Sequence, residues 1–310
     1  MSSLKLGTRG SALALWQANW TKTELEKRWP ELTIDLVPIK TSGDKILDVP
    51  LAKIGGKGLF TKEIDEALLD GRIDLAVHSL KDVPFQLPDG IDFAAIPERE
   101  DHRDAFVSNG PSLRDLPAEA KIGTSSLRRQ VQLRHHFPSL NLVTLRGNVD
   151  TRLRKIAAGE FDGIILAAAG LKRLGYAHRI THLLDEDVMI SAVGQGALGI
   201  VCRSDDASTR DLIQVLDHSP SRTAVTAERG FLRALGGSCQ IPVAGKADVQ
   251  DQRLTIKGLI ASLDGKRVIA EELTGSAERP TDLGLELGQK LLSMGAAEIL
   301  AEISRYGADR

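Results

Sequence analysis

The chain has 310 residues, of which 42% are hydrophobic and 26% charged, and its formal net charge is −2. These values are typical of a globular protein with two or three domains. No apolar run reaches the roughly 20 residues that a membrane helix requires, and the N-terminus shows no targeting signal, so we expect a cytoplasmic protein without a membrane partner. Only 4% of the residues are aromatic, which is poor material for stacking nucleic-acid bases.

The first part of the chain alternates strand and helix patterns. Strands are predicted at residues 4–7, 32–39 and 73–80, and helices from Ser11 to about Arg28 and over residues 58–71. Ser11 is a suitable helix cap, and Gly71 is a suitable stop. The charged stretch PEREDHRDAF follows Ile96 and predicts a crossing into a second domain.

The pattern of strand, turn and helix then repeats at residues 121–137, 142–159 and 161–175. This rhythm is typical of a mostly parallel sheet that is covered on both faces. The glycine-rich segment AVGQGALGIVCR, residues 192–203, leads into a strand that could return the chain to the first domain. Two further helices are predicted at residues 205–217 and 221–235.

Beyond residue 235 the pattern changes to consecutive strands. These are PVAGKADV, RLTIKGLIASL and RVIAEELTG, with a hairpin turn at Asp264-Gly265 and helices at residues 281–294 and 296–304. We therefore predict an α/β protein with two lobes around a cleft and a small C-terminal α+β domain. The predicted domains are residues 1–98 with 196–217, residues 99–195, and residues 218–310.

Positive charge is concentrated in the second predicted domain. Between Lys121 and His182, eleven Lys and Arg residues stand against three acidic residues, a net excess of eight positive charges that indicates an anionic partner. Arg128 and Arg129 are the most informative pair, because cations in the first turn of a helix oppose its dipole by about 0.3–1 kcal/mol each. Together with the free N–H groups of the helix end, they favour a carboxylate or phosphate site over a solvated surface pair.

Cations also occur at other junctions where a predicted helix follows a predicted strand. Arg146 follows a predicted strand, Arg152 lies early in the next helix, and Arg9 stands between the first strand and the helix capped by Ser11. Because ligands bind beyond the carboxyl ends of strands in open α/β sheets, these motifs could face one cleft.

The segment IGGKGLF, residues 54–60, has its glycines flanked by Lys53 and Lys57. It lacks the spacing of a nucleotide-binding P-loop, and GQGALG at residues 194–199 leads into a strand instead of a helix, so neither motif predicts a nucleotide site. Two interpretations of the lysine segment stay open. It is either a flexible loop that carries lysines into the cleft or a plain surface loop.

The segment HSLKDVP, residues 78–84, ends a buried strand with Lys81 and Asp82 side by side. A carboxylate at this end of a strand could stabilise a developing cation or accept a hydrogen bond from a substrate N–H group. From spacing alone, an ordinary turn aspartate is the stronger interpretation. His78 is expected to be a satisfied residue of the core.

The two cysteines cannot form a disulfide framework and show no metal-site spacing, so no metal is expected. Cys202 lies in an apolar strand and is predicted to be a buried thiol. Cys239 lies in GGSCQIP, where exposure and nearby basic groups would make a thiol reactive. From the residues alone, Cys239 is a reactive or covalently modified thiol that faces an anion-binding cleft.

Characteristic motifs follow one another along almost the whole chain. They are TRGSALALWQ, KTSGD, LAKIGGKGLFTKE, DLAVHSLKDVP, EREDHRDAFV, IGTSSLRRQ, LRGNVDTRL, AAAGLKRL, AVGQGALGI and ERGFLRALGGSCQIPVAG. In order and spacing the chain resembles the porphobilinogen deaminase, or hydroxymethylbilane synthase, family. The last motif is long and specific and surrounds Cys239, whereas the chain beyond residue 245 is less distinctive.

The resemblance implies two lobes like those of periplasmic binding proteins and a third domain. It implies a transferase of tetrapyrrole biosynthesis that condenses four porphobilinogen molecules head to tail, releases ammonia at each step and frees hydroxymethylbilane with water. The primer would be a dipyrromethane cofactor held by a thioether to Cys239, and the protein would be a monomer. Since every pyrrole carries an acetate and a propionate, the basic block would bind a growing polyanion.

The resemblance also implies roles for single residues. Asp82 would be the central catalytic carboxylate, which hydrogen-bonds pyrrole N–H groups and stabilises the cationic azafulvene left when ammonia departs. Lys53 and Lys57 would lie on a mobile loop, and Gln195 near the hinge of the cleft. The residues expected to bind cofactor or substrate are Arg9, Ser11, Lys81, Ser126, Arg128, Arg129, Arg146, Arg152, Arg173 and Gln195.

Two other functions stay open from the residues alone. A non-catalytic two-lobe binding protein for a small polycarboxylate would share the lobe pattern, although an exposed thiol has no role in such a protein. Nucleic-acid binding through the basic block would give an affinity that falls steeply with salt. The scarce aromatic residues make it the weakest alternative.

Overall fold

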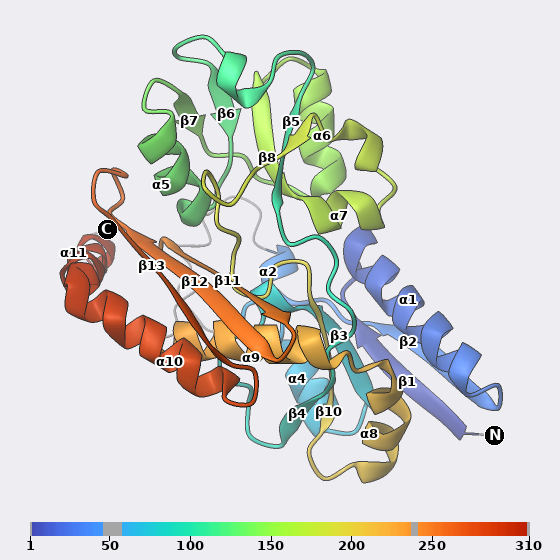
Figure 1. Cartoon of the computed structure of the whole chain (residues 1–310). Helices are drawn as coiled ribbons and strands as arrows, with labels where there is room; N and C mark the ends of the chain where they lie inside the picture. The colour runs from blue at the N-terminus through green and yellow to red at the C-terminus, as the bar shows by residue number, and fades with distance from the viewer. Residues whose placement is uncertain (1, 46–57, 237–240, 309–310) are drawn as a thin grey trace.

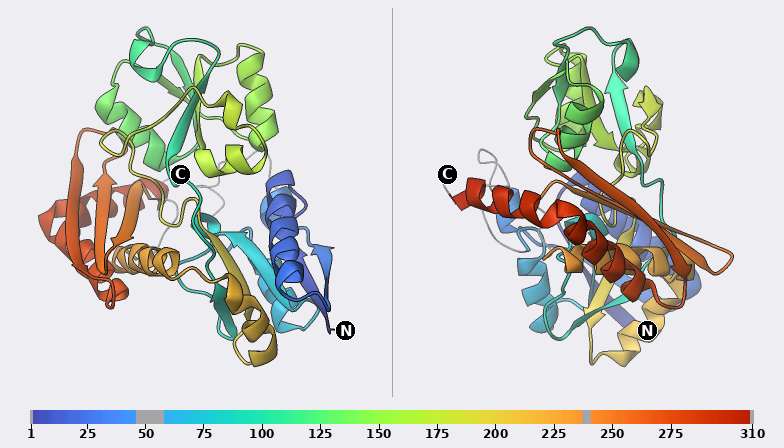
Figure 2. Two further views of the ribbon diagram at one scale, coloured as in Figure 1. Left: turned by 45° about the vertical axis from the view of Figure 1, so that its right-hand side comes forward. Right: turned by 60° about the vertical axis from the view of Figure 1, so that its left-hand side comes forward.

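The computed structural model describes residues 2–45, 58–236 and 241–308. Figure 1 shows an N-terminal α/β lobe in blue and cyan, a second α/β lobe in green above it, and a C-terminal domain in orange and red beside them. Two extended segments of chain join the lobes at a hinge, the first crossing at residues 96–103 and the second crossing at residues 191–197, and Figure 2 shows them from two further sides. The prediction of two α/β lobes followed by a small α+β domain is confirmed.

The first lobe is built on a five-stranded sheet with the order β2-β1-β3-β10-β4. Its strands are β1 (Ser2–Thr8), β2 (Leu32–Pro38), β3 (Leu75–Ser79), β4 (Ile91–Ala95) and β10 (Leu198–Arg203), and its helices are α1 (Ala12–Arg28), α2 (Ser42–Lys45), α4 (Lys62–Leu69) and α8 (Ala207–Ile213). Two apolar clusters, one around Leu25 and Ile200 and one around Ile64 and Val201, cover its two faces. The strand β10 lies between β3 and β4 of this sheet and is antiparallel to both.

The second lobe repeats this plan with the strand order β7-β6-β8-β5-β9. Its strands are β5 (Asp104–Ser108), β6 (Lys121–Gly123), β7 (Asn141–Val143), β8 (Gly163–Ala167) and β9 (His182–Leu183), and its helices are α5 (Leu127–His136), α6 (Val149–Ala157) and α7 (Ala168–Arg173). Apolar side chains again pack on both faces, with Phe106 on one and Leu145 on the other.

Each sheet is mostly parallel, as expected, but contains one antiparallel strand. In the first lobe β1 is parallel to β2 and β3, but β10 is antiparallel to β3 and β4. In the second lobe β6 is parallel to β7 and β8, but β5 is antiparallel to β8 and β9. The reason is the double crossing: β5 and β10 each enter directly from the other lobe, so they start at the edge where the parallel strands end.

The C-terminal domain places helices on one face of an antiparallel sheet. Its elements are α9 (Ser219–Ala234), β11 (Val243–Gln250), β12 (Arg253–Ala261), β13 (Val268–Ser276), α10 (Pro280–Leu291) and α11 (Ala297–Ala308). The predicted turn at Asp264-Gly265 joins β12 to β13. Phe231 and Leu287 are fully buried between the helices and the sheet, while Leu259 packs with Val131 of α5, so the other face of the sheet meets the second lobe. Within the described residues, no helix is long and apolar enough to span a membrane.

Candidate active site

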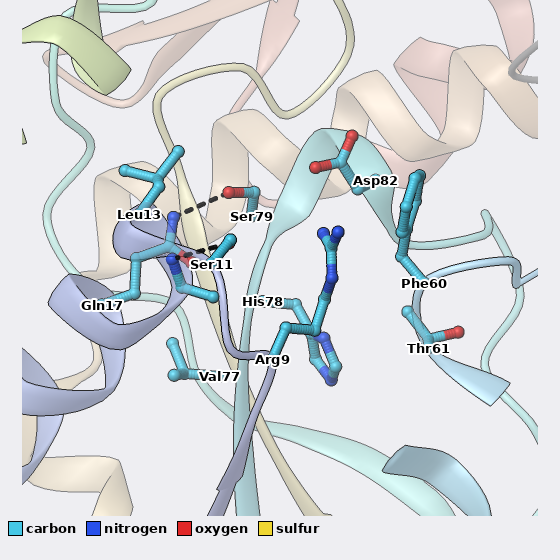
Figure 3. A pocket seen from close by; sticks show the side chains of 11 residues that line it. Arg9, Ser11, Leu13, Gln17, Phe60, Thr61, Val77, His78, Ser79 and Asp82 are labelled. Carbon is cyan, nitrogen blue, oxygen red and sulfur yellow. Dashed lines mark hydrogen bonds between the residues drawn. The ribbon is translucent and has the colours of Figure 1, made fainter. Parts of the chain in front are cut away.

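A cavity of about 70 Å³ lies beside the carboxyl ends of β1 and β3. Its lining residues are Arg9, Ser11, Leu13, Ala14, Gln17, Phe60, Thr61, Val77, His78, Ser79 and Asp82. Figure 3 shows the Arg9 guanidinium pointing toward the Asp82 carboxylate, with the Phe60 ring beside it. The Arg9 Cζ atom lies 4.1 Å from the centroid of the Phe60 ring. A cation and an exposed carboxylate therefore share one opening.

The junction between β1 and α1 fixes one wall of this cavity. Ser11 caps α1 as predicted, because its Oγ accepts a hydrogen bond from the Ala14 N–H at 3.3 Å. Thr8 Oγ1 donates to the Ala14 carbonyl at 3.1 Å, which closes the same turn. One turn further along α1, Gln17 Nε2 donates to Ser79 Oγ at 2.7 Å and ties the helix to the end of β3.

Arg9 is held by a carboxylate that the sequence did not single out. Its Nε donates to the two Asp44 carboxylate oxygens at 3.2 and 3.3 Å, and its Nη2 also contacts Asp44. Thr41 Oγ1 donates to Asp44 at 2.8 Å. These contacts hold the pKa of Asp44 below its ordinary value although burial alone raises it. The pairing fixes the Arg9 fork in the cavity.

Lys81 and Asp82 lie on a short 3₁₀ turn, Leu80–Asp82, at the end of β3. Leu80 is buried and its N–H donates to the Ala197 carbonyl at 3.0 Å, which anchors the turn to the second crossing. Asp82 is exposed, whereas Lys81 is partly buried. Burial lowers the pKa of Lys81 to about 8, although the carboxylate of Asp82 opposes this change. A large share of Lys81 is therefore cationic at neutral pH, beside an exposed carboxylate.

Arg128 and Arg129 have a partner within the protein. They are only 5% and 6% exposed, and both bind the fully buried Asp104. Arg128 Nη1 donates to Asp104 Oδ2 at 2.7 Å and to the Ile190 carbonyl at 2.8 Å. Arg129 Nε donates to Asp104 Oδ1 at 2.9 Å, and Nη1 donates to the Ile165 carbonyl at 3.0 Å. From the sequence, an anion was expected beside these two arginines at the start of α5. In the structure, Asp104 is such an anion.

Gln195 lies in the second crossing and is 1% exposed. Its Nε2 donates to the His102 carbonyl at 2.7 Å and to Asp104 Oδ1 at 3.0 Å. Its Oε1 lies 3.5 Å from Lys81 Nζ. The structure thus brings Lys81 of the first lobe and the arginine pair of the second lobe together at the hinge.

A second group of cations lies at the start of α6. Asn148 caps this helix, with its Oδ1 accepting from the Thr151 N–H at 2.9 Å, and Arg152 Nε donates to the Gly147 carbonyl at 2.8 Å. Burial, together with the like charges of Arg129 and Arg146, lowers the pKa of Arg152 to about 10. Guanidinium groups of the same sign are therefore gathered at one place, which an anionic ligand would stabilise.

Arg173 connects the second lobe to the hinge and to the first lobe. Its Nη2 donates to the Gly196 carbonyl at 2.7 Å, and its Cζ lies 5.7 Å from the centroid of the Trp16 ring of α1. Burial lowers the pKa of Arg173 to about 10. Ser126 caps α5 through the Arg129 N–H at 3.4 Å, so its Oγ is already engaged in the helix end.

The remaining predicted residues divide into two groups. Lys53, Lys57 and Cys239 lie outside the described residues. Cys202 is a fully buried free thiol, as predicted, and burial raises its pKa. His78 is buried as predicted, and burial lowers its pKa to about 4, so the imidazole is neutral. Its Nε2 has no hydrogen-bond partner among the described residues, so the expectation of a satisfied core histidine is only half met.

Comparison with known proteins gives two family models that together match most of the chain. "Porphobilinogen deaminase, dipyromethane cofactor binding domain" matches residues 4–211, and "Porphobilinogen deaminase, C-terminal domain" matches residues 222–293. The chain belongs to the porphobilinogen deaminase family. The porphobilinogen deaminase of Geobacter sulfurreducens is 53% identical to it over 310 residues, which is 100% of this chain and 98% of that protein. That of Syntrophotalea carbinolica is 55% identical over 303 residues, 97% of this chain and 96% of that protein.

Solved structures of two-lobe binding proteins are more distant. The methionine-binding protein MetQ is 14% identical, with 69% of this chain and 89% of that chain covered and a TM-score of 0.43. This likeness is too distant to carry an argument about function. The family assignment rests on the sequence relatives and the family models.

The described residues fit the dipyrromethane cofactor of the porphobilinogen deaminase family. Each pyrrole of such a group carries an acetate and a propionate on its two β-carbons, and its N–H group lies on the opposite edge of the ring. The cations Arg129, Arg146 and Arg152 suit the carboxylates, because they act on one another at one place and guanidinium groups form strong charge-assisted pairs with carboxylates. The exposed carboxylate of Asp82 suits the N–H groups. Within residues 2–45, 58–236 and 241–308, no cluster of His, Cys, Asp and Glu could hold a metal ion.

Asp104 and Asp44, which orient three of the predicted arginines, were not predicted from the sequence. A signal existed for Asp104, because this acidic residue stands directly before the apolar residues 105–107. Fully buried acids require paired cations, and Arg128 and Arg129 of the same lobe were already predicted to bind an anion. For Asp44, the surrounding TSGD sequence indicates only a turn.

Proposed function

We propose that this chain is the transferase that deaminates and condenses four porphobilinogen molecules head to tail on a covalently bound dipyrromethane primer and releases hydroxymethylbilane. Membership of the porphobilinogen deaminase family supports an enzyme over a non-catalytic binding protein. The observation that carries the proposal in the structure is the exposed carboxylate of Asp82 among the cations Arg9 and Lys81. A binding protein for a polycarboxylate has use for the cations but not for a carboxylate between them.

We propose that the cations of the site and the polar residues beside them bind the carboxylates of the ligand. These residues are Arg9, Ser11, Lys81, Ser126, Arg128, Arg129, Arg146, Arg152, Arg173 and Gln195. Charge-assisted pairs with guanidinium groups are strong and fix the plane of a carboxylate. Because these residues come from both lobes, a ligand bound to them orients its pyrroles across the boundary between the lobes.

Each addition forms a C–C bond between the aminomethyl carbon of one pyrrole and the free α-carbon of another. The C–N bond of the aminomethyl group breaks, and ammonia and the α-proton leave. Loss of ammonia from porphobilinogen places positive charge on its pyrrole, and we assign the stabilisation of this charge to Asp82. A fixed carboxylate beside a developing cation lowers the barrier because its charge is already in place. Asp82 also accepts a hydrogen bond from the pyrrole N–H and assists the proton transfers.

The bound dipyrromethane supplies the free α-carbon to which the first substrate is joined. We propose that a thioether attaches the dipyrromethane to Cys239. We also propose that Lys53 and Lys57 belong to a mobile loop that extends over the ligand. We further propose that the protein acts as a monomer in the cytoplasm, with porphobilinogen as its small-molecule partner and without nucleic acid.

The intact mass of the purified chain tests this proposal. We expect the wild-type chain to be heavier than its polypeptide by a dipyrromethane, and to colour when it is treated in acid with a pyrrole-reactive aldehyde. Cys239→Ala should lose both signals, whereas Cys202→Ala, the matched control at the buried thiol, should keep them. A wild-type mass equal to that of the bare polypeptide would exclude the covalent primer and with it the proposed reaction.

A further inference from the structure

Asp104 is the first residue of β5 and follows directly on the first crossing between the lobes. Its side chain is fully buried and accepts hydrogen bonds from two separate parts of the structure. Arg128 and Arg129 reach it from the N-terminal end of α5, and Gln195 Nε2 reaches it from the second crossing at 3.0 Å. One carboxylate therefore joins both crossings to the helix that carries the arginine pair.

The contacts of Asp104 fix the arginines but do not neutralise them. Two guanidinium groups share a single carboxylate, so the trio keeps one excess positive charge. The two arginines hold the pKa of Asp104 below its ordinary range, although burial alone raises it. The Ile190 and Ile165 carbonyls bind one arginine each, so each planar fork is held at more than one nitrogen. A guanidinium has five N–H groups. Among the described residues, Arg128 and Arg129 each use three of them in contacts with Asp104 and a backbone carbonyl, so further N–H groups can bind an anion.

Gln195 extends the same arrangement to the first lobe. Its amide nitrogen donates to Asp104 Oδ1 and to the His102 carbonyl, so its amide oxygen is turned toward Lys81 Nζ, 3.5 Å away. The charge of Asp104 also acts on Lys81 directly and raises its pKa, in opposition to burial and to both arginines. Asp104 thus influences the place and the charge of a cation on the opposite lobe.

We propose that Asp104 is a positioning residue for substrate carboxylates: it fixes Arg128 and Arg129 in the second lobe and, through Gln195, the place of Lys81 in the first. Cations from both lobes then meet a bound carboxylate in one geometry. The inference rests on the proposed function, since it concerns the carboxylates of the pyrrole ligand. It goes beyond that function because Asp104 is fully buried and acts on the ligand only through the arginines and Gln195.

The test compares two substitutions with different effects on charge and place. Asp104→Asn keeps the shape and removes the charge, and we expect KM for porphobilinogen to rise about 10- to 100-fold with a smaller change in kcat. Lys81 should lose its proton at lower pH, measured as the pH dependence of acylation at Lys81 by peptide mass spectrometry on the full-length chain. Asp104→Glu keeps the charge but displaces it, so the Lys81 titration should return toward wild type while KM stays raised.

Asp65→Asn is the matched control, because Asp65 is also a buried carboxylate but lies on α4, where its described hydrogen-bond partner is Thr61. It should change neither KM nor the Lys81 titration. An unchanged KM and an unchanged titration in folded Asp104→Asn would overturn the proposal, and so would full recovery of KM in Asp104→Glu. If Asp104→Asn fails to fold, the KM of Asp104→Glu tests the proposal by itself. Lys81 labelling needs no turnover. If the wild-type chain shows no turnover of porphobilinogen while Asp104→Asn still shifts the Lys81 titration, the proposed function is refuted but the effect of Asp104 on Lys81 is not.

Discussion

The carboxylate of Asp82 stands exposed on a turn whose neighbouring side chains are cationic. Lys81 precedes it in the same turn, and the Arg9 guanidinium points toward it across the cavity. An isolated binding site for acids gains nothing from such a carboxylate, because it repels the ligand. Its presence is explained when positive charge develops on the substrate during the reaction, since a fixed negative charge then stabilises the transition state more than the ground state.

Asp82→Asn tests this role directly. The amide keeps the shape and can still accept a hydrogen bond from a pyrrole N–H, but it carries no charge. We expect kcat to fall about 10²- to 10³-fold, because the loss of one preorganised electrostatic group costs about 3–4 kcal/mol. Thermal unfolding and the mass of the covalent primer should stay as in the wild type. Asp89→Asn, at an exposed aspartate of the same lobe, is the control and should leave kcat unchanged, and near-normal turnover in Asp82→Asn would refute the catalytic role.

At this scale the sequence predicts which residues are unusual but not what they touch. Arg128 and Arg129 were recognisable because cations oppose the dipole at a helix start. Their partner Asp104 precedes them by 24 and 25 residues, and only the pairing of β5 with β8 brings it beside α5. The cap at Ser11 was predictable from the sequence because its hydrogen bond to Ala14 spans three residues.

The two crossings between the lobes contact each other at Gly196. Its φ angle is +87°, and a Cβ added there would lie 2.3 Å from the Glu100 carbonyl oxygen of the other crossing. The Gly196 carbonyl accepts hydrogen bonds from the Glu100 N–H at 3.3 Å and from Arg173 Nη2 at 2.7 Å. Only glycine allows the segments to approach this closely, so the packing of the hinge depends on this position.

Gly196→Ala should therefore separate the crossings and displace Arg173. Gly159→Ala is the matched control, because Gly159 also has a positive φ angle, +73°, but no atom lies within 4 Å of an added Cβ. The control should lower stability by about 1–2 kcal/mol, which is the cost of left-handed backbone for alanine. Gly196→Ala should lower Tm further and also raise KM for porphobilinogen. Equal Tm values and equal KM values for the two variants would show that the close approach has no effect.

Elements with strong local signals were predicted well. The helix Ala12–Arg28 and the strand Leu32–Pro38 match the expected ranges closely, because hydrophobic period and caps are local features. The strand Asp104–Ser108 was not predicted, since it starts in a charged stretch and is stabilised by neighbours from distant parts of the chain. The antiparallel direction of β5 and β10 depends on the double crossing, which no local pattern encodes.

The position of the third domain against the second lobe depends on contacts between distant parts of the chain. The turn at Asp264-Gly265 was predictable from turn chemistry. Its docking was not, because Arg134 Nη1 of α5 donates to the Leu263 carbonyl at 2.6 Å across 129 residues. A Cβ on Gly265 would lie 2.7 Å from the Val131 carbonyl oxygen, so the turn is packed tightly on α5. The helix that carries the site arginines at one end is thus held by the third domain along its length.

Both crossings meet the C-terminal domain at Glu228 of α9, which is fully buried. Its carboxylate accepts from Arg99 Nη1 at 2.6 Å in the first crossing and from the Gly194 N–H at 2.6 Å in the second. It also accepts from the Ala247 N–H at 2.8 Å in β11. Both crossings are thereby fixed to the domain whose sequence includes Cys239.

Glu228→Gln should loosen this junction, because it leaves the largely buried cation of Arg99 without the counter-charge of Glu228, at a cost of about 3–5 kcal/mol. We expect a marked fall in Tm and faster proteolytic cleavage within residues 96–103 and 191–197. Glu302→Gln is the control, since Glu302 forms an exposed pair with Arg267 and its loss should cost about 1 kcal/mol or less. If both substitutions lowered Tm equally and left proteolysis unchanged, Glu228 would not be the residue that holds the crossings to the third domain. Because both crossings end at the strands that position Asp104 and Lys81, a loosened junction should also raise KM for porphobilinogen.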